Sequence, residues 1–386
     1  MEMFNARKET KRMEGYFHRL QKAEQHGQTI ESWRRRNILK KIGATGLVLT
    51  ALISLGAKNI EDNRVDDARL HTSVSYITAA HDPINNDTAI VFLNGVATNN
   101  ADNLVGSLTG AVQQVTDGEA WSVRYWSSLD TQNTVDAILA LAEDRNKTSL
   151  VLAGYSTGGT IAVAIADTIM RESAIEIKMI DLFSSQSGVE DERPTSRAGA
   201  DAFVNVVDAV PGIAYWDPFR FMGEMIVRAG RYTHEQDVPT TVTKFFETAN
   251  DVVNNIDGAD VPSVPLMYDQ LLAIKDARIN DHFKSIVTTS YPQLMPVIAY
   301  FGTPPSGYDI NVNDVQSANT YCRLAENSHL PCYSYGVPGL VHGVPELSVD
   351  QYKETFKKAA AELQATLAHQ EYVYNNAAIQ HKLYFE

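Results

Sequence analysis

The sequence predicts an α/β fold, with a mostly parallel sheet covered by helices on both faces, plus an inserted helical cap. Three observations lead to this fold class. Short apolar runs typical of buried strands alternate with helical segments from residue 89 to residue 183. The alternation stops over 184–289, where proline-punctuated helical segments predict an insertion, and it resumes at Met295–Phe301. An uncharged apolar segment near the N-terminus predicts in addition a transmembrane or signal segment.

These patterns divide the chain of 386 residues into six parts. We assign a basic cytoplasmic tail, a membrane anchor or signal h-region, a linker, an α/β core in two pieces, a helical cap insertion and a C-terminal tail. In that order they span 1–41, 42–57, 58–69, 70–183 with 290–370, 184–289 and 371–386.

The N-terminal part combines positive charge with an apolar run. Residues 1–41 contain eleven Lys and Arg against five Glu, which gives +6, whereas the whole chain carries −14, so the remaining residues carry −20. An acidic body disfavours nucleic acid as a partner of the folded part. Ile42–Ala57 follows, sixteen residues without a charge. Positive charge before an apolar run places the N-terminus in the cytoplasm.

We expect residues 42–57 to be an uncleaved membrane anchor that places the body outside the cytoplasm. A cleaved signal peptide is the alternative, because Ser54–Ala57 ends the run in small residues, and the protein would then be secreted. A core helix of the main domain is a third interpretation, although nothing else in this region resembles a domain.

The only two cysteines, Cys322 and Cys332, fit an exported protein. In an oxidising compartment we expect them to form a disulfide, with two buried free thiols as the alternative. No C-x-x-C or H-E-x-x-H motif is present, so the sequence predicts neither a metal site nor a cofactor.

The first half of the core has the strand and helix pattern of a parallel sheet. A first strand or hairpin arm is expected at Leu70–Ala79, where the sequence alternates. The segments that follow are, in order, a strand at Ala89–Leu93, a helix at Ala101–Gln114, a strand at Trp121–Trp126, a helix at Thr134–Arg145, a strand at Ser149–Ala153, a helix at Thr160–Met170 and a strand at Ile175–Phe183.

The second half contains the cap and the remaining core. The expected cap helices are Ala198–Val207, Phe219–Ala229, Val242–Val253 and Met267–Ala277. The expected core segments are a strand at Met295–Phe301, a loop at Gly302–Asn319, a strand at Cys332–Gly336 and an amphipathic helix at Ser348–His369.

The strongest motif is Gly154-Tyr155-Ser156-Thr157-Gly158, which lies between an apolar strand and an apolar helix. That is the context of a nucleophile elbow, a tight turn that exposes a serine hydroxyl. Gly154 and Gly158 remove side chains from the crowded turn, and Gly159 lets the helix lie close to the sheet. A glycine-rich turn without chemistry is the alternative. A phosphate-binding loop is disfavoured, because the Gly-Lys pair of that motif is missing.

A serine nucleophile needs a base, which in this topology follows it in the chain. The histidines between Ser156 and the last helix are His234, His282, His329 and His342. His342 is our candidate, because it lies after the last strand and before the final helix, on the same side of the sheet as the elbow. His329 comes next, and a solvated loop histidine is the alternative for either.

The orienting acid should lie between the serine and the histidine. Asp309 is the candidate, eight residues past the Met295–Phe301 strand and followed by small apolar residues. Asp314 and Asp181 are the alternatives, and each could instead be an ordinary turn or capping aspartate. The acid would hold the tautomer of the histidine and stabilise the imidazolium.

The developing oxyanion needs two backbone amides. Thr157, directly after Ser156 at a helix N-terminus, should supply one of them. The other is expected from the loop after Ala89–Leu93, at Val96. Asn94 in that loop is either a turn residue or a hydrogen-bonding partner that shapes the site.

With these residues in place, the chain resembles the α/β-hydrolase fold family over Leu70–His369. The resemblance is carried by Gly154–Gly158, Asp309, His342 and an Asn94-Gly95 pair where the family often has His-Gly. It implies hydrolysis through an acyl-enzyme, with esters, thioesters, amides or lactones as substrates.

The resemblance therefore favours a serine hydrolase, esterase- or lipase-like, with a small-molecule or lipid-like acyl substrate. Together with the apolar segment 42–57, it predicts a membrane-anchored enzyme that faces outside the cytoplasm. Because the family also includes transferases and non-catalytic members, two alternatives stay open. One is an acyltransferase that uses the same three residues. The other is a non-catalytic binding protein on a hydrolase scaffold.

Overall fold

A computed structural model describes residues 72–385 of the chain, with gaps at 83–86, 97, 126–127, 211–220, 222–224, 226–237, 256–263, 289–293, 308, 310, 341 and 343–344. The predicted basic tail, the apolar segment 42–57 and the linker lie outside these residues, as does nearly all of the helix expected at Phe219–Ala229. Among the helices that are described, none combines the length and apolar character needed to cross a membrane.

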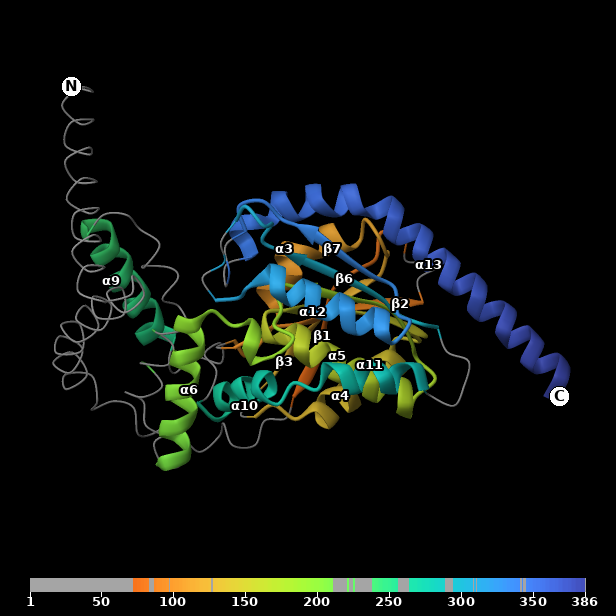
Figure 1. Cartoon of the computed structure of the whole chain (residues 1–386), viewed down its shortest axis with the longest axis horizontal. Coiled ribbons are helices and arrows are strands. Elements are labelled where there is room, and N and C mark those ends of the chain that lie inside the picture. The colour runs from red at the N-terminus through yellow and green to blue at the C-terminus, as the bar shows by residue number, and fades with distance from the viewer. Residues whose placement is uncertain are drawn as a thin grey trace, which may run out of the picture. The chain divides into compact units, whose positions relative to one another are not determined.

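The core is a seven-stranded sheet with the strand order β1-β3-β2-β4-β5-β6-β7. Figure 1 shows the sheet among the helices that surround it. All neighbouring strands are parallel except β1, which pairs antiparallel with β3 at one edge. The strands are β1 (Ser73–Thr78), β2 (Thr88–Leu93), β3 (Glu119–Arg124), β4 (Ser149–Tyr155), β5 (Glu176–Phe183), β6 (Val297–Gly302) and β7 (Cys332–Gly336). The predicted mostly parallel sheet is confirmed.

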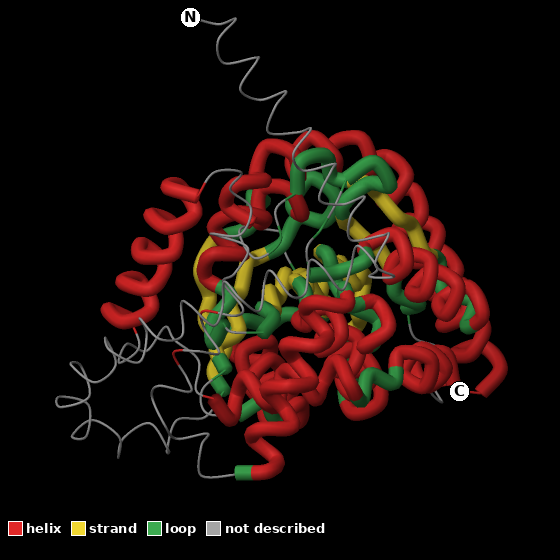
Figure 2. Tube along the Cα trace, turned by 60° about the vertical axis from the view of Figure 1, so that its left-hand side comes forward, coloured by secondary structure: helices red, strands yellow, loops and turns green. Residues whose placement is uncertain are grey.

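Helices cover the sheet on both faces, as the continuous apolar strands require (Figure 2). The described helices are α3 (Asp102–Val112), α4 (Thr131–Asp144), α5 (Thr157–Glu172), α6 (Pro194–Ala209), α9 (Val238–Asn255), α10 (Val264–Lys275), α11 (Ile279–Thr288), α12 (Asp314–Asn327) and α13 (Val349–Phe385), with short 3₁₀ segments at η2 (Val189–Asp191) and η4 (Pro345–Ser348).

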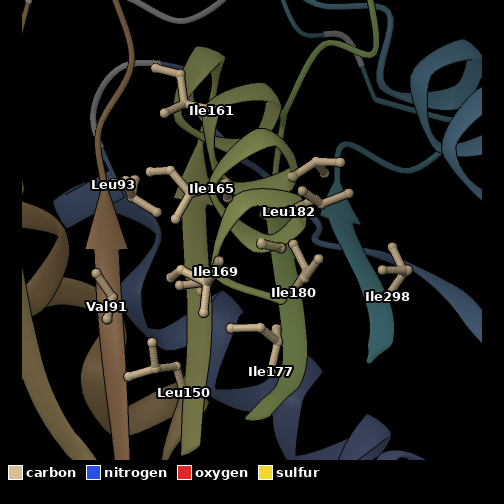
Figure 3. Close-up of a cluster of buried hydrophobic side chains, with 14 of the residues drawn as sticks. Val91, Leu93, Leu150, Ile161, Ile165, Ile169, Ile177, Ile180, Leu182 and Ile298 are labelled. Atoms are coloured by element: carbon tan, nitrogen blue, oxygen red, sulfur yellow. The ribbon is translucent and has the colours of Figure 1, made fainter. Parts of the chain in front are cut away.

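Two apolar layers hold the helices to the sheet. On one face α4, α5, α11 and α12 pack on the strands, and on the other α3 and α13 do so. Figure 3 shows the first layer, where Ile161, Ile165 and Ile169 of α5 lie over the central strands. Because α5 is buried on nearly every side, its first residues are held rigidly at the end of β4.

Three expectations about the elements differ from the structure. Residues 314–319, expected as loop, begin helix α12, whose buried positions are mostly small or polar, such as Ser317 and Ala318, so its apolar periodicity was weak. Helix α11, within the segment assigned to the cap, buries Phe283 and its neighbours in the core beside α5. Helix α13 continues to Phe385, through the segment assigned to a C-terminal tail.

Helix α12 is joined to β7 by a disulfide between Cys322 and Cys332. Replacing both cysteines with serine should lower the free energy of unfolding by about 2–3 kcal/mol, because the crosslink spans ten residues and restricts the unfolded chain. Urea denaturation of the double variant beside the wild type would measure this. Wild-type protein whose unfolding midpoint does not change on adding a reductant would contradict it.

Candidate active site

The turn between β4 and α5 consists of Ser156 alone, because β4 ends at Tyr155 and α5 begins at Thr157. The backbone of Ser156 has φ 54° and ψ −129°, a conformation that residues with a side chain rarely adopt. Such a residue costs on the order of 1–3 kcal/mol and persists only when its surroundings hold it. Here the Ser156 N–H donates to the Phe183 carbonyl oxygen at 2.8 Å, which ties the turn to β5.

Glycines make this turn sterically feasible. A Cβ atom added to Gly154 would overlap the Gly158 backbone, and one added to Gly158 would overlap the Leu93 carbonyl group. A Cβ on Gly159 would collide with the side chain of Ser185 at the end of β5. The three glycines therefore let the elbow, the start of α5 and the neighbouring strands approach one another closely.

The structure brings the three sequence-predicted side chains together in one hydrogen-bonded chain. His342 Nε2 lies 3.1 Å from Ser156 Oγ, and His342 Nδ1 lies 2.8 Å from Asp309 Oδ2. The side chains of His342 and Asp309 are 7% and 1% exposed, so the contact is shielded from water. This arrangement lets the imidazole accept a proton from the serine while the carboxylate orients it.

Asp309 is held by its own loop as well as by the histidine. Its Oδ1 atom accepts hydrogen bonds from the N–H groups of Asn311 at 2.7 Å and Val312 at 3.0 Å. Burial acts to raise the pKa of this carboxyl, but the charge and hydrogen bond of His342 and the two amides lower it below its usual value. Asp309 is therefore ionised at neutral pH.

The same contact shifts the pKa of His342 upward. Burial acts to lower the pKa of the imidazole, yet the charge and hydrogen bond of Asp309 raise it above the usual value, with smaller contributions from Asp314 and Glu192. Because only the neutral imidazole can accept the serine proton, kcat/KM should fall as the pH decreases. The pH at which kcat/KM falls to half of its maximum should lie above 6.5, the pKa of an ordinary imidazole. A pH–rate profile would measure this midpoint. A midpoint below 6.5 would contradict the placement of Asp309.

Asp314, the first alternative acid, contacts other groups. It accepts hydrogen bonds from the Tyr300 hydroxyl and the Thr303 N–H, both at 2.7 Å, at the point where α12 begins. Burial and the nearby charge of Asp309 raise its pKa. These contacts tie the end of β6 to α12 and do not reach His342.

Asp181, the second alternative, is fully buried on β5, in register with Ala153 and Ala299. Among the residues that the structure describes, neither of its carboxyl oxygens has a hydrogen-bond partner. Burial raises the pKa of this carboxyl well above its usual value, so the protonated form is favoured. A group without a link to His342 cannot orient the imidazole.

Replacing Asp181 with asparagine should raise the free energy of unfolding at about pH 8 by about 1–3 kcal/mol. The pKa of the carboxyl is higher in the folded than in the unfolded state, so the wild type loses stability as the pH rises from the unfolded pKa to the folded one. Urea denaturation at about pH 5 and about pH 8 tests this, with the larger gain expected at the higher pH. A gain equal at both values would show that ionisation of Asp181 is not its cause.

The other histidines have different roles. His329 is exposed in the turn after α12, with a positive φ of 58°. His282 Nδ1 donates to Asp167 Oδ2 at 2.8 Å, which fastens α11 to α5. His234 lies outside the described residues.

The loop after β2 lies directly against the elbow. A Cβ added to Gly95 would be 2.8 Å from Ser156 Cβ and 3.0 Å from the Thr157 nitrogen. Asn94 shapes this loop, because its Oδ1 accepts from the Gly95 N–H at 2.9 Å and its Nδ2 donates to the Asn100 carbonyl at 3.0 Å. Since the Gly95 amide is engaged, Val96 and Thr157 keep their place as the candidate oxyanion donors.

Two groups of polar residues near the site could not be predicted from the sequence pattern. The Thr98 hydroxyl donates to the Gly95 carbonyl at 2.7 Å, and the Thr98 carbonyl accepts from Gln270 of α10 at 2.9 Å. Glu192, before α6, is half-buried near His342 and has a pKa raised to about 7 by burial and by the charge of Asp201. These residues are polar side chains in unremarkable segments, and only the folded chain places them here.

No protein-family model matches the sequence, and no curated protein matches it. Solved structures with a similar fold include a carboxylesterase from the thaumarchaeon Nitrososphaera gargenis, with 11% identity, coverage of 77% of this chain and 96% of that chain, and a TM-score of 0.47. MenH from S. aureus has 15% identity, coverage of 76% and 99%, and a TM-score of 0.45. A lipase-esterase related protein from Clostridium acetobutylicum has 14% identity, coverage of 76% and 98%, and a TM-score of 0.44. At such identities only the geometry of the site can indicate its chemistry.

Proposed function

We propose that this protein, which has the α/β-hydrolase fold, is a serine hydrolase that cleaves ester-type bonds of a small-molecule or lipid-like acyl substrate. The observation that carries the proposal is the hydrogen-bonded chain from Ser156 through His342 to Asp309. It begins at a strained elbow that presents the serine at the end of a central strand. A serine, a base and a buried acid in this order are the parts of a nucleophilic acyl transfer.

In the first half-reaction Ser156 Oγ attacks the carbonyl carbon of the ester as His342 Nε2 takes its proton. The backbone amides of Thr157 and Val96 stabilise the negative charge that develops on the carbonyl oxygen. His342 then gives the proton to the leaving alcohol, and the acyl group stays on Ser156. In the second half-reaction water attacks the acyl-enzyme, with His342 again acting as base and then as acid.

An apolar cluster beside the oxyanion loop supports an acyl substrate of apolar character. Phe203 and Val207 of α6 and Met267 of α10 are buried together, and Val96 packs against them. A substrate whose carbonyl oxygen lies near the Val96 amide would therefore have apolar side chains close to its acyl group. This supports an esterase- or lipase-like activity.

Labelling with a fluorophosphonate probe, which reacts with activated serines, tests the proposal. Wild-type protein should be labelled, whereas Ser156→Ala should not. Ser173→Ala, the same substitution at the other end of α5, is the matched control and should be labelled like the wild type. Wild-type labelling no stronger than that of Ser156→Ala would refute a serine hydrolase.

We further propose that the protein is anchored in a membrane through residues 42–57 and that its catalytic body lies outside the cytoplasm. The basic residues before this segment and the disulfide between Cys322 and Cys332 support the proposal. The full chain should stay in the membrane fraction after alkaline carbonate extraction, and a Leu49→Arg/Leu52→Arg variant should not. Recovery of the wild type in the soluble fraction would refute anchoring, and a mature N-terminus near Ala57 would indicate a cleaved signal instead.

A further inference from the structure

We propose that Arg193 is a positioning residue for the catalytic acid, and that it couples Asp309 to the cap helix α6. The inference rests on the proposed function, because Asp309 is an orienting acid only in a serine hydrolase. Arg193 lies 116 residues before Asp309 in the sequence, in the segment that leads from η2 into α6.

The segment around Arg193 forms a short antiparallel pairing with the loop that carries Asp309. The Arg193 N–H donates to the Asn311 carbonyl at 2.8 Å, and the Asn313 N–H donates to the Asp191 carbonyl at 2.7 Å. Between these two bonds Glu192 and Val312 form an antiparallel bridge. Backbone hydrogen bonds on both sides of the bridge thus fix the acid loop against the entrance to α6.

The same loop residues hold the carboxylate. Asn311 and Val312 direct their N–H groups to Asp309 Oδ1, while their segment pairs with the Arg193 segment. These two N–H groups bind Oδ1, and the other carboxylate oxygen, Oδ2, is then directed at His342. A shift of residues 311–312 would therefore change the direction of the carboxylate. The orientation of the acid depends on this backbone pairing.

The Arg193 side chain adds a direct bond to the acid residue itself. Its Nε atom donates to the carbonyl oxygen of Asp309 at 3.1 Å. Arg193 is also the N-cap residue of α6, and one turn later Ser196 Oγ donates to Asn311 Oδ1 at 2.9 Å. The start of α6 thus holds the acid loop through one backbone pairing and two side chains.

Helix α6 also connects to the opposite side of the site. Its Phe203 and Val207 pack with Met267 of α10 and with Val96 of the oxyanion loop. The position of α6 therefore affects the orientation of Asp309 through Arg193, and it affects the placement of the candidate oxyanion amide through Val96. Movement of this helix would disturb both parts of the catalytic machinery.

Steady-state kinetics of Arg193→Ala on a p-nitrophenyl ester tests the proposal. We expect kcat to fall on the order of tenfold to a hundredfold with KM within about twofold, because the acid is misplaced while the acyl site is unchanged. Arg193→Lys, which keeps the charge and a donor, should recover part of kcat. Arg323→Ala removes an exposed arginine from α12 and serves as the matched control with wild-type kinetics. A KM effect alone would overturn the proposal.

The pH profile separates positioning from a merely structural role. The carboxylates that raise the pKa of His342 are Asp309 from the acid loop, Asp314 from α12 and Glu192 from the segment before α6. Displacing Asp309 removes the largest of these contributions. The acid limb of kcat/KM should therefore move to lower pH in Arg193→Ala, and an unmoved limb would contradict the proposal.

An NMR titration of His342, made in the Ser156→Ala background, gives a readout that needs no activity. The His342 pKa should be lower when Arg193→Ala is added and unchanged when Arg323→Ala is added. If the wild type is not labelled by the fluorophosphonate and this shift is still seen, the hydrolase proposal fails, and only the structural part of the inference, that Arg193 holds Asp309 against His342, is supported. If labelling succeeds while kcat and the His342 pKa stay at wild-type values, the positioning role is wrong. Should Arg193→Ala not fold, Arg193→Met, which keeps the apolar stem and lacks the Nε donor to the Asp309 carbonyl, takes the same measurements, and wild-type values of kcat and of the His342 pKa would overturn the inference.

Discussion

Replacing Ser156 with alanine should lower kcat for ester hydrolysis on the order of 10⁵- to 10⁶-fold, with the overall fold retained. The variant lacks Ser156 Oγ, the atom that lies 3.1 Å from His342 Nε2 and that would attack the substrate, so no acyl-enzyme can form. The expected residual rate above that of water comes from the oxyanion amides and from substrate binding. Alanine also removes no backbone contact, because the N–H bond to Phe183 remains.

Initial rates on a p-nitrophenyl ester, compared with circular dichroism of both proteins, would measure this effect. Ser173→Ala should match the wild type in kcat within about twofold, since the Ser173 hydroxyl donates to the Ile169 carbonyl in the last turn of α5 and accepts from the Ile175 N–H, away from the catalytic residues. A Ser156→Ala variant that keeps more than about one percent of kcat would show that another group performs the attack.

Replacing Asp309 with asparagine should lower kcat on the order of 10⁴-fold, the loss observed when the orienting aspartate of a serine protease is made neutral. Asparagine cannot stabilise the imidazolium, and its amide can favour the tautomer of His342 that points a proton at Ser156. The acid limb of the pH profile should also move to lower pH, because the negative charge that raises the His342 pKa is gone.

Asp314→Asn is the matched control for this experiment. It removes a buried carboxylate five residues further on, which bonds to Tyr300 and Thr303 and not to His342. We expect less than a tenfold loss of kcat, together with a lower unfolding midpoint, because a buried hydrogen-bonded group is altered. If Asp314→Asn loses more activity than Asp309→Asn, the acid has been assigned to the wrong carboxylate.

Much of the fold could be predicted because its strands and helices have local signatures. The apolar runs of β2, β4 and β6 and the apolar helix after Ser156 were all placed within a few residues of their observed bounds. The sequence pattern does not predict helix α12, because the buried face of this helix contains serine, alanine and tyrosine rather than large aliphatic residues. Helix α11 was not separated from the cap, because its packing on α5 depends on a surface far away in the sequence.

The local chemistry of the elbow was determined by the sequence itself. Gly154, Ser156 and Gly158 fit a turn in which any added side chain would meet backbone atoms, and this constraint acts between residues only a few positions apart. The choice of base and acid was decided by the tertiary structure. Ser156 and His342 are 186 residues apart, and His342 and Asp309 are 33 apart, so no local interaction relates them.

They meet because the carboxyl ends of parallel strands lie at one edge of the sheet, where the loops that follow β4, β6 and β7 converge. Asp314 is bonded to Tyr300 near this edge, whereas Asp181 is buried within β5 and its carboxyl oxygens have no hydrogen-bond partner among the described residues, a distinction that spacing alone could not make. The roles of Arg193, Thr98 and Gln270 likewise arise only from segments that folding brings together.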